Sequence, residues 1–279
     1  GSMGDTTGAT NEGGDAQKQL DVIADRMILD ALRDAPVAAY LSEETGAPVA
    51  LCPDASCLVA CDPLDGSSNI DCNAPIGTIC SIMPAVGDME SGFLQPGHTQ
   101  LAALFILYGP QLSMVVSVGQ GTALFVYSPD QGCFVCVEER LQIPASYPEF
   151  AVNVAYMGHW HSGMRAWFDR CIAGREGAWG QDYRMRWVGS LVADAYRIFM
   201  RGGIFLYPCD MRASYREGRL RLLYEACPIA MLVEQAGGQA YADDGPVLLR
   251  QPEALHQRTG LVFGSADEVE RWRSCEDLV

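Results

Sequence analysis

The chain has little positive charge and no long apolar stretch. Of its 279 residues, 19 are lysine or arginine and 35 are aspartate or glutamate, which gives a formal net charge of −16. Proteins that bind nucleic acid depend on basic side chains to neutralise phosphates, so this composition argues against that class. No apolar run approaches the roughly 18 residues that a membrane-spanning helix needs, so the sequence predicts no such helix.

The sequence also shows no signal peptide, and its cysteines do not follow the spacing of a small disulfide-bonded protein. The 11 cysteines are scattered through apolar stretches. Disulfide frameworks are typical of short secreted chains, so we expect a cytoplasmic, reducing location. Residues 1–14, rich in Gly, Thr and Asn, are expected to form a disordered head, in which Gly1 and Ser2 before Met3 resemble the remnant of a purification tag.

The remaining composition indicates a globular protein with substantial cores. Hydrophobic residues make up 49% of the chain, and its length allows one large domain or two. The pattern changes around residues 146–148, so we predict an N-terminal lobe over residues 15–146 and a C-terminal lobe over residues 147–279. Periodicity alone predicts a mixture of helices and strands in both, an α/β (α+β) fold.

The first lobe is predicted to begin with a helix. From about Asp15, apolar side chains recur at helical spacing and are expected to form its buried stripe: Leu20, Ile23, Met27 and Ala31. Asp21 and Asp25 lie on a different face, which would leave Asp21 free to point into a site. The predicted elements that follow are strands at 49–51, 58–61 and 78–83, a helix at about 100–107, and antiparallel strands at 114–118, 123–127 and 132–137.

The second lobe is predicted to alternate strands and helices. Its glycine pairs are typical of helix C-termini, where a residue with positive φ is favoured. The predicted strands are 151–156, 204–207 and 261–264, and the predicted helices are 164–172, 189–200, 227–235 and a last one beginning at Ala266.

The most informative segment runs from Cys61 to Asp71, with the sequence CDPLDGSSNID. It follows a predicted buried strand, and Pro63 has no N–H for a sheet ladder, so we expect the acids to lie where the strand ends. There Asp62 and Asp65 could bind a common Mg²⁺ or Mn²⁺, because both ions prefer oxygen ligands.

The second half of the segment favours an anion. Gly66, Ser67 and Ser68 place backbone amides and hydroxyls at an expected helix start, where a phosphate is stabilised. A metal and a phosphate would therefore meet at this point. The alternative is a plain surface turn in which Ser67 is a helix N-cap.

The segment from Asp62 to Asp71 resembles the signature of the class I fructose-1,6-bisphosphatases, which belong to the lithium-sensitive, metal-dependent sugar and inositol phosphatases. Further blocks resemble this family and follow its order along the chain: residues 14–22 (GDAQKQLDV), 41–44 (LSEE), 76–79 (IGTI), 189–194 (GSLVAD), 202–208 (GGIFLYP), 219–225 (RLRLLYE) and 256–258 (HQR). The resemblance implies a layered αβαβα sandwich with the active site between two lobes.

The resemblance also implies two to three Mg²⁺ ions, or Mn²⁺, per subunit. Its implied metal ligands are Asp15, Glu43, Asp62, the Leu64 carbonyl, Asp65 and Glu225. Asp21 and Glu44 match the residues thought to polarise the attacking water, since a carboxylate close to metal-bound water can accept its proton. Glu225 precedes an apolar helix, where burial of a carboxylate is costly without a cation.

A second set of residues is implied to bind the substrate. Arginine gives paired hydrogen bonds to phosphate and tyrosine gives one directed hydrogen bond. The implied contacts are Gly66, Ser67, Ser68, Asn153, Tyr156, Arg186, Tyr207, Arg219 and Arg221. In the family the residue at Arg186 reaches the neighbouring subunit's site, which implies a homo-oligomer, a dimer or a tetramer.

Two substrate positions and the AMP site depart from the family pattern. Many members have lysine at Arg219 and tyrosine at Trp187, so one phenol contact to phosphate is missing while the charge is retained. Animal members bind AMP through an N-terminal helical segment, a Lys-Tyr pair and an arginine, whereas this chain nearly lacks that segment and has Ser56, Cys57 and Pro84 at the other positions. We therefore predict no inhibition by AMP at that site.

The resemblance implies an enzyme that removes the 1-phosphate of fructose 1,6-bisphosphate in gluconeogenesis or a carbon-fixation cycle. Sedoheptulose-1,7-bisphosphatase, or an enzyme of dual specificity, is the first alternative. An inositol-monophosphatase-like activity is less favoured, because it needs no second phosphate anchor such as Tyr207 with Arg219 and Arg221. A binding protein that has lost catalysis is disfavoured by the complete set of acids.

Overall fold

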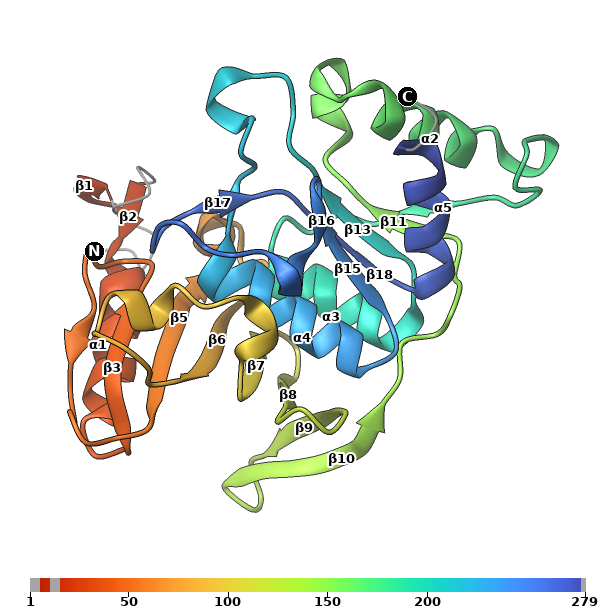
Figure 1. The fold of residues 1–279 in the computed structure, drawn as a ribbon. Coiled ribbons are helices and arrows are strands. Elements are labelled where there is room, and N and C mark those ends of the chain that lie inside the picture. The colour runs from red at the N-terminus through yellow and green to blue at the C-terminus, as the bar shows by residue number, and fades with distance from the viewer. Residues whose placement is uncertain (1–5, 11–15, 277–279) are drawn as a thin grey trace.

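The structure is a computed structural model that describes residues 6–10 and 16–276. Two sheets enclose a layer of helices, and further helices cover the outer face of each sheet (Figure 1). The order of layers is helix, sheet, helix, sheet, helix, which confirms the expected αβαβα arrangement and the α+β class. In the described part of the chain, no helix is both long and apolar enough to span a membrane.

The larger sheet has eight strands and forms most of the first half of the chain. Its spatial order is β10-β9-β8-β7-β6-β5-β3-β4, and every neighbouring pair is antiparallel except β3 with β5. The strands are β3 (Val37–Ser42), β4 (Val49–Ala50), β5 (Cys57–Asp65), β6 (Ile76–Pro84), β7 (Ala102–Tyr108), β8 (Leu112–Ser117), β9 (Thr122–Ser128) and β10 (Cys133–Leu141). The predicted strands and the antiparallel run at the end of this lobe are confirmed.

One predicted helix is wrong, because the residues around 100–107 form strand β7. Ala103, Phe105 and Leu107 are buried, whereas the residues between them are half-buried. This alternation has the period of two that belongs to a strand with one covered face. In a short apolar run this period is easily mistaken for a buried helix.

The smaller sheet belongs to the second half of the chain. Its spatial order is β12-β11-β13-β18-β15-β16, and its strands are β11 (Glu149–Ala151), β12 (Arg184–Met185), β13 (Ile204–Tyr207), β15 (Gln239–Ala242), β16 (Gly245–Pro246) and β18 (Leu261–Gly264). The predicted strand 151–156 is wrong beyond Ala151. Asn153 accepts a hydrogen bond from the Ala155 N–H and begins a 3₁₀ helix, Val154–His159.

The helices α3 (Leu191–Arg201) and α4 (Cys227–Gln235) lie between the two sheets, as Figure 1 shows. On the outer side of the smaller sheet are α2 (Ser162–Ile172) and α5 (Ala266–Glu276). One continuous buried cluster joins side chains of both halves, such as Phe105 of β7 and Phe199 of α3. The division into lobes at residues 146 and 147 therefore stays a prediction, although the chain changes sheets there.

The first helix, α1 (Gln19–Leu32), covers β3 and β5, but its orientation differs from the prediction. Ile23 and Met27 of the expected buried stripe are 51% and 67% exposed. Asp21 is instead the buried residue of this helix. The periodicity gave the helix but not its face, because the inward side of α1 is shared between Asp21 and only partly buried side chains such as Ile28.

Part of the predicted disordered head is a strand. Residues Thr6–Thr10 form β1, which pairs antiparallel with β2 (Ala16–Lys18). Three threonines in this short segment favour an extended backbone, because β-branched side chains fit a strand well. The rest of the predicted head, residues 1–5 and 11–14, lies outside the described residues, as does Asp15.

Candidate active site

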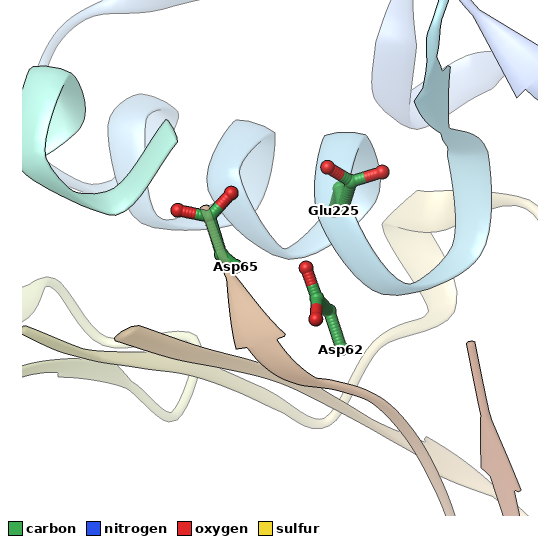
Figure 2. Close-up of side chains that lie close together, drawn as sticks. All are labelled: Asp62, Asp65 and Glu225. Carbon is green, nitrogen blue, oxygen red and sulfur yellow. The ribbon is translucent and has the colours of Figure 1, made fainter. Parts of the chain in front are cut away.

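Three carboxylates that are far apart in the sequence meet between β5 and α4. Asp62 and Asp65 lie near the end of β5, and Glu225 lies in the π-helical turn Leu222–Ala226 that leads into α4. Their closest oxygens all lie within 4.8 Å of one another, and all three residues are buried. Figure 2 shows the three side chains turned toward the same space.

Asp62 and Asp65 share one face of the sheet because β5 carries a bulge. Asp62 pairs with Ile79 of β6 and Asp65 pairs with Gly77, so three steps along β5 match two steps along β6. In a regular strand, residues three positions apart point to opposite faces, whereas one extra residue brings them to the same face. The prediction that β5 ends at Pro63 is therefore wrong, because the bulge accommodates a residue that has no N–H to give.

Asp65 is held by the start of helix α3. Its Oδ2 accepts hydrogen bonds from the Ser190 hydroxyl at 2.8 Å and from the Val192 N–H at 3.0 Å. Ser190 is also the N-cap of α3. Gly66 makes this approach possible: its φ is +75°, and a Cβ there would lie 2.7 Å from the Ser190 Cβ. The carboxylate thus sits at a helix N-terminus, where negative charge is stabilised.

The other two acids are also fixed by backbone donors. The Leu64 N–H donates to Asp62 Oδ1 at 3.0 Å, and the Arg221 N–H donates to Glu225 Oε2 at 2.5 Å. The Arg221 guanidinium is almost fully buried, and its Nη2 lies 3.5 Å from Glu43 Oε1. The positive charge of Arg221 therefore partly neutralises the negative charge of Glu43 and the neighbouring acids.

Burial and mutual repulsion raise the pKa of the clustered carboxyls. The pKa of Asp62 is raised by burial first and then by the charges of Glu43, Glu225 and Asp65. The pKa of Glu225 is raised by burial and by Glu43. The pKa of Asp65 is raised by burial, although its hydrogen bonds from α3 oppose the shift. A divalent cation bound by these oxygens would remove the repulsion, so the donor set fits a hard metal ion.

These acids line one end of a cavity of about 640 Å³, and most of the predicted site residues line it as well. Predicted residues on its wall are Asp21, Glu43, Glu44, Asp62, Leu64, Asp65, Gly66, Ser67, Ser68, Tyr207, Arg219, Arg221 and Glu225. Asp71, Tyr215, Leu220 and Arg258 also line the cavity and were not predicted as site residues. The wall thus joins β5, α1 and the segments on either side of α4.

The two predicted water-polarising residues reach this cavity from separate elements. Asp21 comes from the first turn of α1 and is 3% exposed. Glu43 and Glu44 follow β3, where the Glu43 N–H donates to the Cys61 carbonyl at 3.1 Å and the Glu44 N–H donates to Ser42 Oγ at 3.1 Å. The end of β3 is therefore tied to β5, beside Asp62.

A second part of the cavity wall, the cationic end, is formed by Arg219 and the tyrosines around it. The Arg219 guanidinium carbon lies 3.6 Å from the ring centroid of Tyr215, 4.6 Å from that of Tyr156 and 5.6 Å from that of Tyr207. Among the described residues, no carboxylate lies within 4.0 Å of Arg219. Its positive charge is therefore available to an anionic ligand.

Two predicted substrate contacts lie away from the cavity wall. The Asn153 side-chain oxygen accepts the Ala155 N–H at 3.1 Å, and Arg186 is exposed, with its Nη1 donating to the Met185 carbonyl at 2.9 Å. Neither is among the residues that line the cavity, whereas Tyr156 reaches it through its contact with Arg219.

Known proteins resemble this chain over nearly its whole length. The chain matches the family described as "Fructose-1-6-bisphosphatase, N-terminal domain" over residues 2–139 and "Fructose-1-6-bisphosphatase, C-terminal domain" over residues 143–277. It is 51% identical over 263 residues to a class 1 fructose-1,6-bisphosphatase of Azorhizobium caulinodans, covering 93% of this chain and 80% of that protein. The corresponding enzyme of Rhizobium meliloti is 52% identical over 270 residues, covering 95% and 77%.

A solved structure agrees with both sequence matches. The fructose-1,6-bisphosphatase of Leishmania major in its holo form superposes with a TM-score of 0.92 and 32% sequence identity, covering 99% of this chain and 86% of that one. The chain belongs to the class 1 fructose-1,6-bisphosphatases. It is therefore a phosphatase, and the family implies a divalent metal cofactor.

Two residues at the site, Ser190 and Tyr215, were not predicted from the sequence. Ser190 lies in a block that resembled the family, and its place before an apolar helix is the signal of an N-cap, but nothing in the sequence links it to Asp65. Tyr215 gave no signal, because it lies in a polar segment, Tyr-Arg-Glu-Gly, that has no apolar period.

Proposed function

We propose that this protein hydrolyses the 1-phosphate of fructose 1,6-bisphosphate to give fructose 6-phosphate and phosphate. The observation that carries the proposal is a single cavity whose wall holds both a buried carboxylate triad and an arginine among tyrosines. A substrate with two phosphates fits such a cavity, because one phosphate needs metal ions and the other needs a cationic anchor.

The acid end provides the reactive site in this proposal. Asp62, Asp65 and Glu225 would hold one Mg²⁺, and Glu43, Asp62 and the Leu64 carbonyl a second; Mn²⁺ has the same oxygen preference. When bound, these ions supply charge neutralisation on the phosphoryl oxygens and an acidified water. The remaining chemistry belongs to the chain itself.

Asp21 and Glu44 are the proposed acceptors of the proton from the attacking water. Both line the cavity, where a carboxylate beside the attacking water can accept its proton. Gly66, Ser67 and Ser68 follow the bulge and would donate hydrogen bonds to the reacting phosphate. Asp15 is the proposed contact to a third ion.

The cationic end would bind the second phosphate. Arg219 offers a planar group for two parallel hydrogen bonds, and Tyr207 and Tyr156 offer one hydroxyl each. Arg221 faces Glu43, so it would support the acids and not the distal phosphate. Asn153 accepts the Ala155 N–H through Oδ1, so its Nδ2 would be the donor to the same phosphate.

Sedoheptulose 1,7-bisphosphate is the second candidate substrate. The observation that favours it is Trp187, which stacks on Phe205 and lies edge-on to Tyr207 where many relatives have a tyrosine. The anchor for the distal phosphate therefore differs from the pattern of the family.

Turnover of both bisphosphates, with and without Mg²⁺, tests the proposal. We expect phosphate release from fructose 1,6-bisphosphate that requires Mg²⁺ or Mn²⁺ and stops with a chelator, and a lower kcat/KM for the sedoheptulose substrate. Hydrolysis that continues unchanged in the chelator would contradict the proposed metal site. A kcat/KM that favours sedoheptulose 1,7-bisphosphate would reverse the order of the two substrates.

We further propose a homo-oligomer that works in the cytoplasm. Arg186 supports the first part, because it is exposed and so is able to reach a neighbouring subunit. The cysteines support the second part, since all 11 are free thiols. Sedimentation of the enzyme together with the activity of Arg186→Ala tests the oligomer: a monomer with full activity contradicts it.

We also propose that AMP does not inhibit the enzyme at the position used by animal relatives. Ser56 is exposed and its carbonyl accepts the Ala85 N–H, and Cys57 and Pro84 face each other across β5 and β6. None of these three side chains supplies a cation for a phosphate. Activity titrated with AMP at a fixed Mg²⁺ concentration should stay constant, and inhibition at micromolar AMP would contradict this prediction.

A further inference from the structure

Tyr215 lines the cavity but is not among the residues that the sequence predicts for the site. It lies at the end of the 3₁₀ turn Ala213–Tyr215, in the segment that connects β13 to β14 (Leu220–Arg221). Its ring is half-buried and carries the closest contact that the Arg219 guanidinium makes with any ring. This contact brings a third phenol next to the cation at the distal end of the cavity.

The segment that carries Tyr215 has a fixed shape. The Tyr215 N–H donates to the Arg212 carbonyl at 3.0 Å, and the Asp210 N–H donates to the Tyr215 carbonyl at 3.2 Å. The Met211 N–H donates to the His159 carbonyl at 2.9 Å, which ties the segment to the turn before α2. The backbone that carries the Tyr215 ring is therefore held by hydrogen bonds on both sides.

Arg212 lies on the other side of the same rings. Its guanidinium carbon is 4.3 Å from the Tyr156 centroid and 4.5 Å from the Tyr215 centroid. Its Nε lies 3.0 Å from both carboxylate oxygens of Asp210, and its Nη2 also donates to Asp210. Asp210 is 4% exposed, so this ion pair holds the plane of the Arg212 guanidinium in place.

Arg212 and Arg219 differ in whether a carboxylate neutralises their charge. Burial raises the pKa of Asp210, but its hydrogen bonds from Arg212 outweigh this effect and leave the pKa below its ordinary value. Arg212 is thus neutralised by a carboxylate, whereas Arg219 has none within ion-pair distance in the described part of the chain. Arg212 can orient the tyrosines, and Arg219 remains able to bind an anion.

Tyr215 differs from Trp187 in carrying a hydroxyl group that can donate a hydrogen bond. The indole of Trp187 packs against Phe205 and Tyr207 and carries no hydroxyl. Tyr215 lines the cavity, and its ring lies against the two guanidinium groups of Arg212 and Arg219. A phosphate dianion accepts several hydrogen bonds, and phenol is a good donor to it.

We propose that Tyr215 is an additional residue of the distal phosphate subsite, and that Arg212 is a positioning residue that holds the Tyr215 ring against Arg219. This inference rests on the proposed function, because it assigns a ligand to the second phosphate of the bisphosphate. Tyr215, in the segment between β13 and β14, would supply a phenol hydroxyl that Trp187 lacks.

The first test compares two substrates in Tyr215→Phe, which keeps the ring and removes the hydroxyl. We expect KM for fructose 1,6-bisphosphate to rise about tenfold, the loss of one hydrogen bond to a charged group, with kcat within about twofold. The kcat/KM for fructose 1-phosphate, which has no distal phosphate, should stay unchanged. Competitive inhibition by fructose 6-phosphate should weaken by the same factor of about ten.

The outcomes separate this inference from the proposed function. Equal losses with both substrates, or no loss with either, would overturn the role of Tyr215 while the wild-type activity upholds the function. A wild-type protein that hydrolyses neither substrate would overturn both. Thermal unfolding of each variant checks that it is folded, and binding of fructose 6-phosphate to the wild type and Tyr215→Phe gives a second measurement without turnover.

The second test addresses Arg212. We expect Arg212→Met to raise KM for fructose 1,6-bisphosphate about fivefold with little change in kcat, but to add less than about twofold in a Tyr215→Ala background. Arg273→Met is the matched control, because Arg273 also stacks on a tyrosine, Tyr241 at 4.6 Å, and pairs with Glu270. Independent, additive effects of Arg212→Met and Tyr215→Ala, or an equal effect of the control, would overturn the positioning role.

Discussion

At one end of the cavity, three buried carboxylates are fixed by a strand bulge, a π-helical turn and a helix N-terminus. At the other end, a half-buried arginine is held among tyrosine rings, one of which comes from a connecting segment. At the acid end, each of the three carboxylates accepts a hydrogen bond from a backbone N–H. The cationic end depends on stacking between side chains.

This difference suggests a division of labour. Metal ions and a developing charge require fixed oxygens, since small displacements are costly in a buried site. A phosphate that does not react requires only charge and hydrogen-bond donors. We therefore expect changes at the acid end to lower kcat and changes at the cationic end to raise KM.

The largest effect is expected for Asp65→Asn. The substitution keeps the shape of the side chain but removes a charge from the metal cluster, so kcat should fall at least about a hundredfold. Steady-state kinetics over a range of Mg²⁺ concentrations provides the measurement. Asp30→Asn on the exposed side of α1 is the control and should leave kcat unchanged. Phosphate release that survives Asp65→Asn would break the comparison.

Removal of metal should destabilise the protein in a pH-dependent way. The pKa values of Asp62, Asp65 and Glu225 are raised in the folded, metal-free protein, so the stability that these carboxyls contribute is greatest at low pH, where they are protonated. That contribution is lost as the pH rises above the ordinary carboxyl range. Bound Mg²⁺ compensates for the loss.

The measurement is Tm with Mg²⁺ minus Tm with a chelator. We expect the difference to grow with pH, from under about 2 °C at pH 5 to about 5 °C or more at pH 8. The difference cancels the titration of groups far from the cluster. In Asp65→Asn it should shrink at every pH. A difference that is constant between pH 5 and pH 8 would show that the cluster does not titrate with the metal.

A smaller effect is expected for Ser190→Ala. The Ser190 hydroxyl both donates to Asp65 and caps α3, so its loss should lower the Mg²⁺ affinity about tenfold and the free energy of unfolding by about 1 kcal/mol. Ser162→Ala, at the exposed start of α2, is the control. A loss of stability with an unchanged Mg²⁺ dependence would assign Ser190 to the helix alone.

Much of this arrangement could be predicted from the sequence. The spacing of apolar residues and the positions of glycines predicted most strands and the helices α2, α3, α4 and α5. The resemblance to the family predicted that the acids share one site. Resemblance predicts contacts between distant residues because the whole fold is inherited with the motif, whereas periodicity reports only local structure.

The failures have local causes. β7 was predicted as a helix because a short apolar run fits the period of a helix as well as that of a strand. The buried face of α1 was predicted wrongly because Asp21, a polar residue, lies on it. Tyr215 and Arg212 act through rings and charges that meet only after the segment from Asp210 to Tyr215 has closed on itself. No pattern in the sequence encodes that meeting.

The single extra residue of β5 has a consequence for any attempt to idealise this protein. Strand residues point up or down by odd and even count, and the bulge converts an odd separation between Asp62 and Asp65 into an even one. If the same residues formed a regular strand without the bulge, one of the two carboxylates would turn toward the opposite face of the sheet. The shared orientation of the two carboxylates thus depends on the bulge, and a redesign that made β5 regular would lose it.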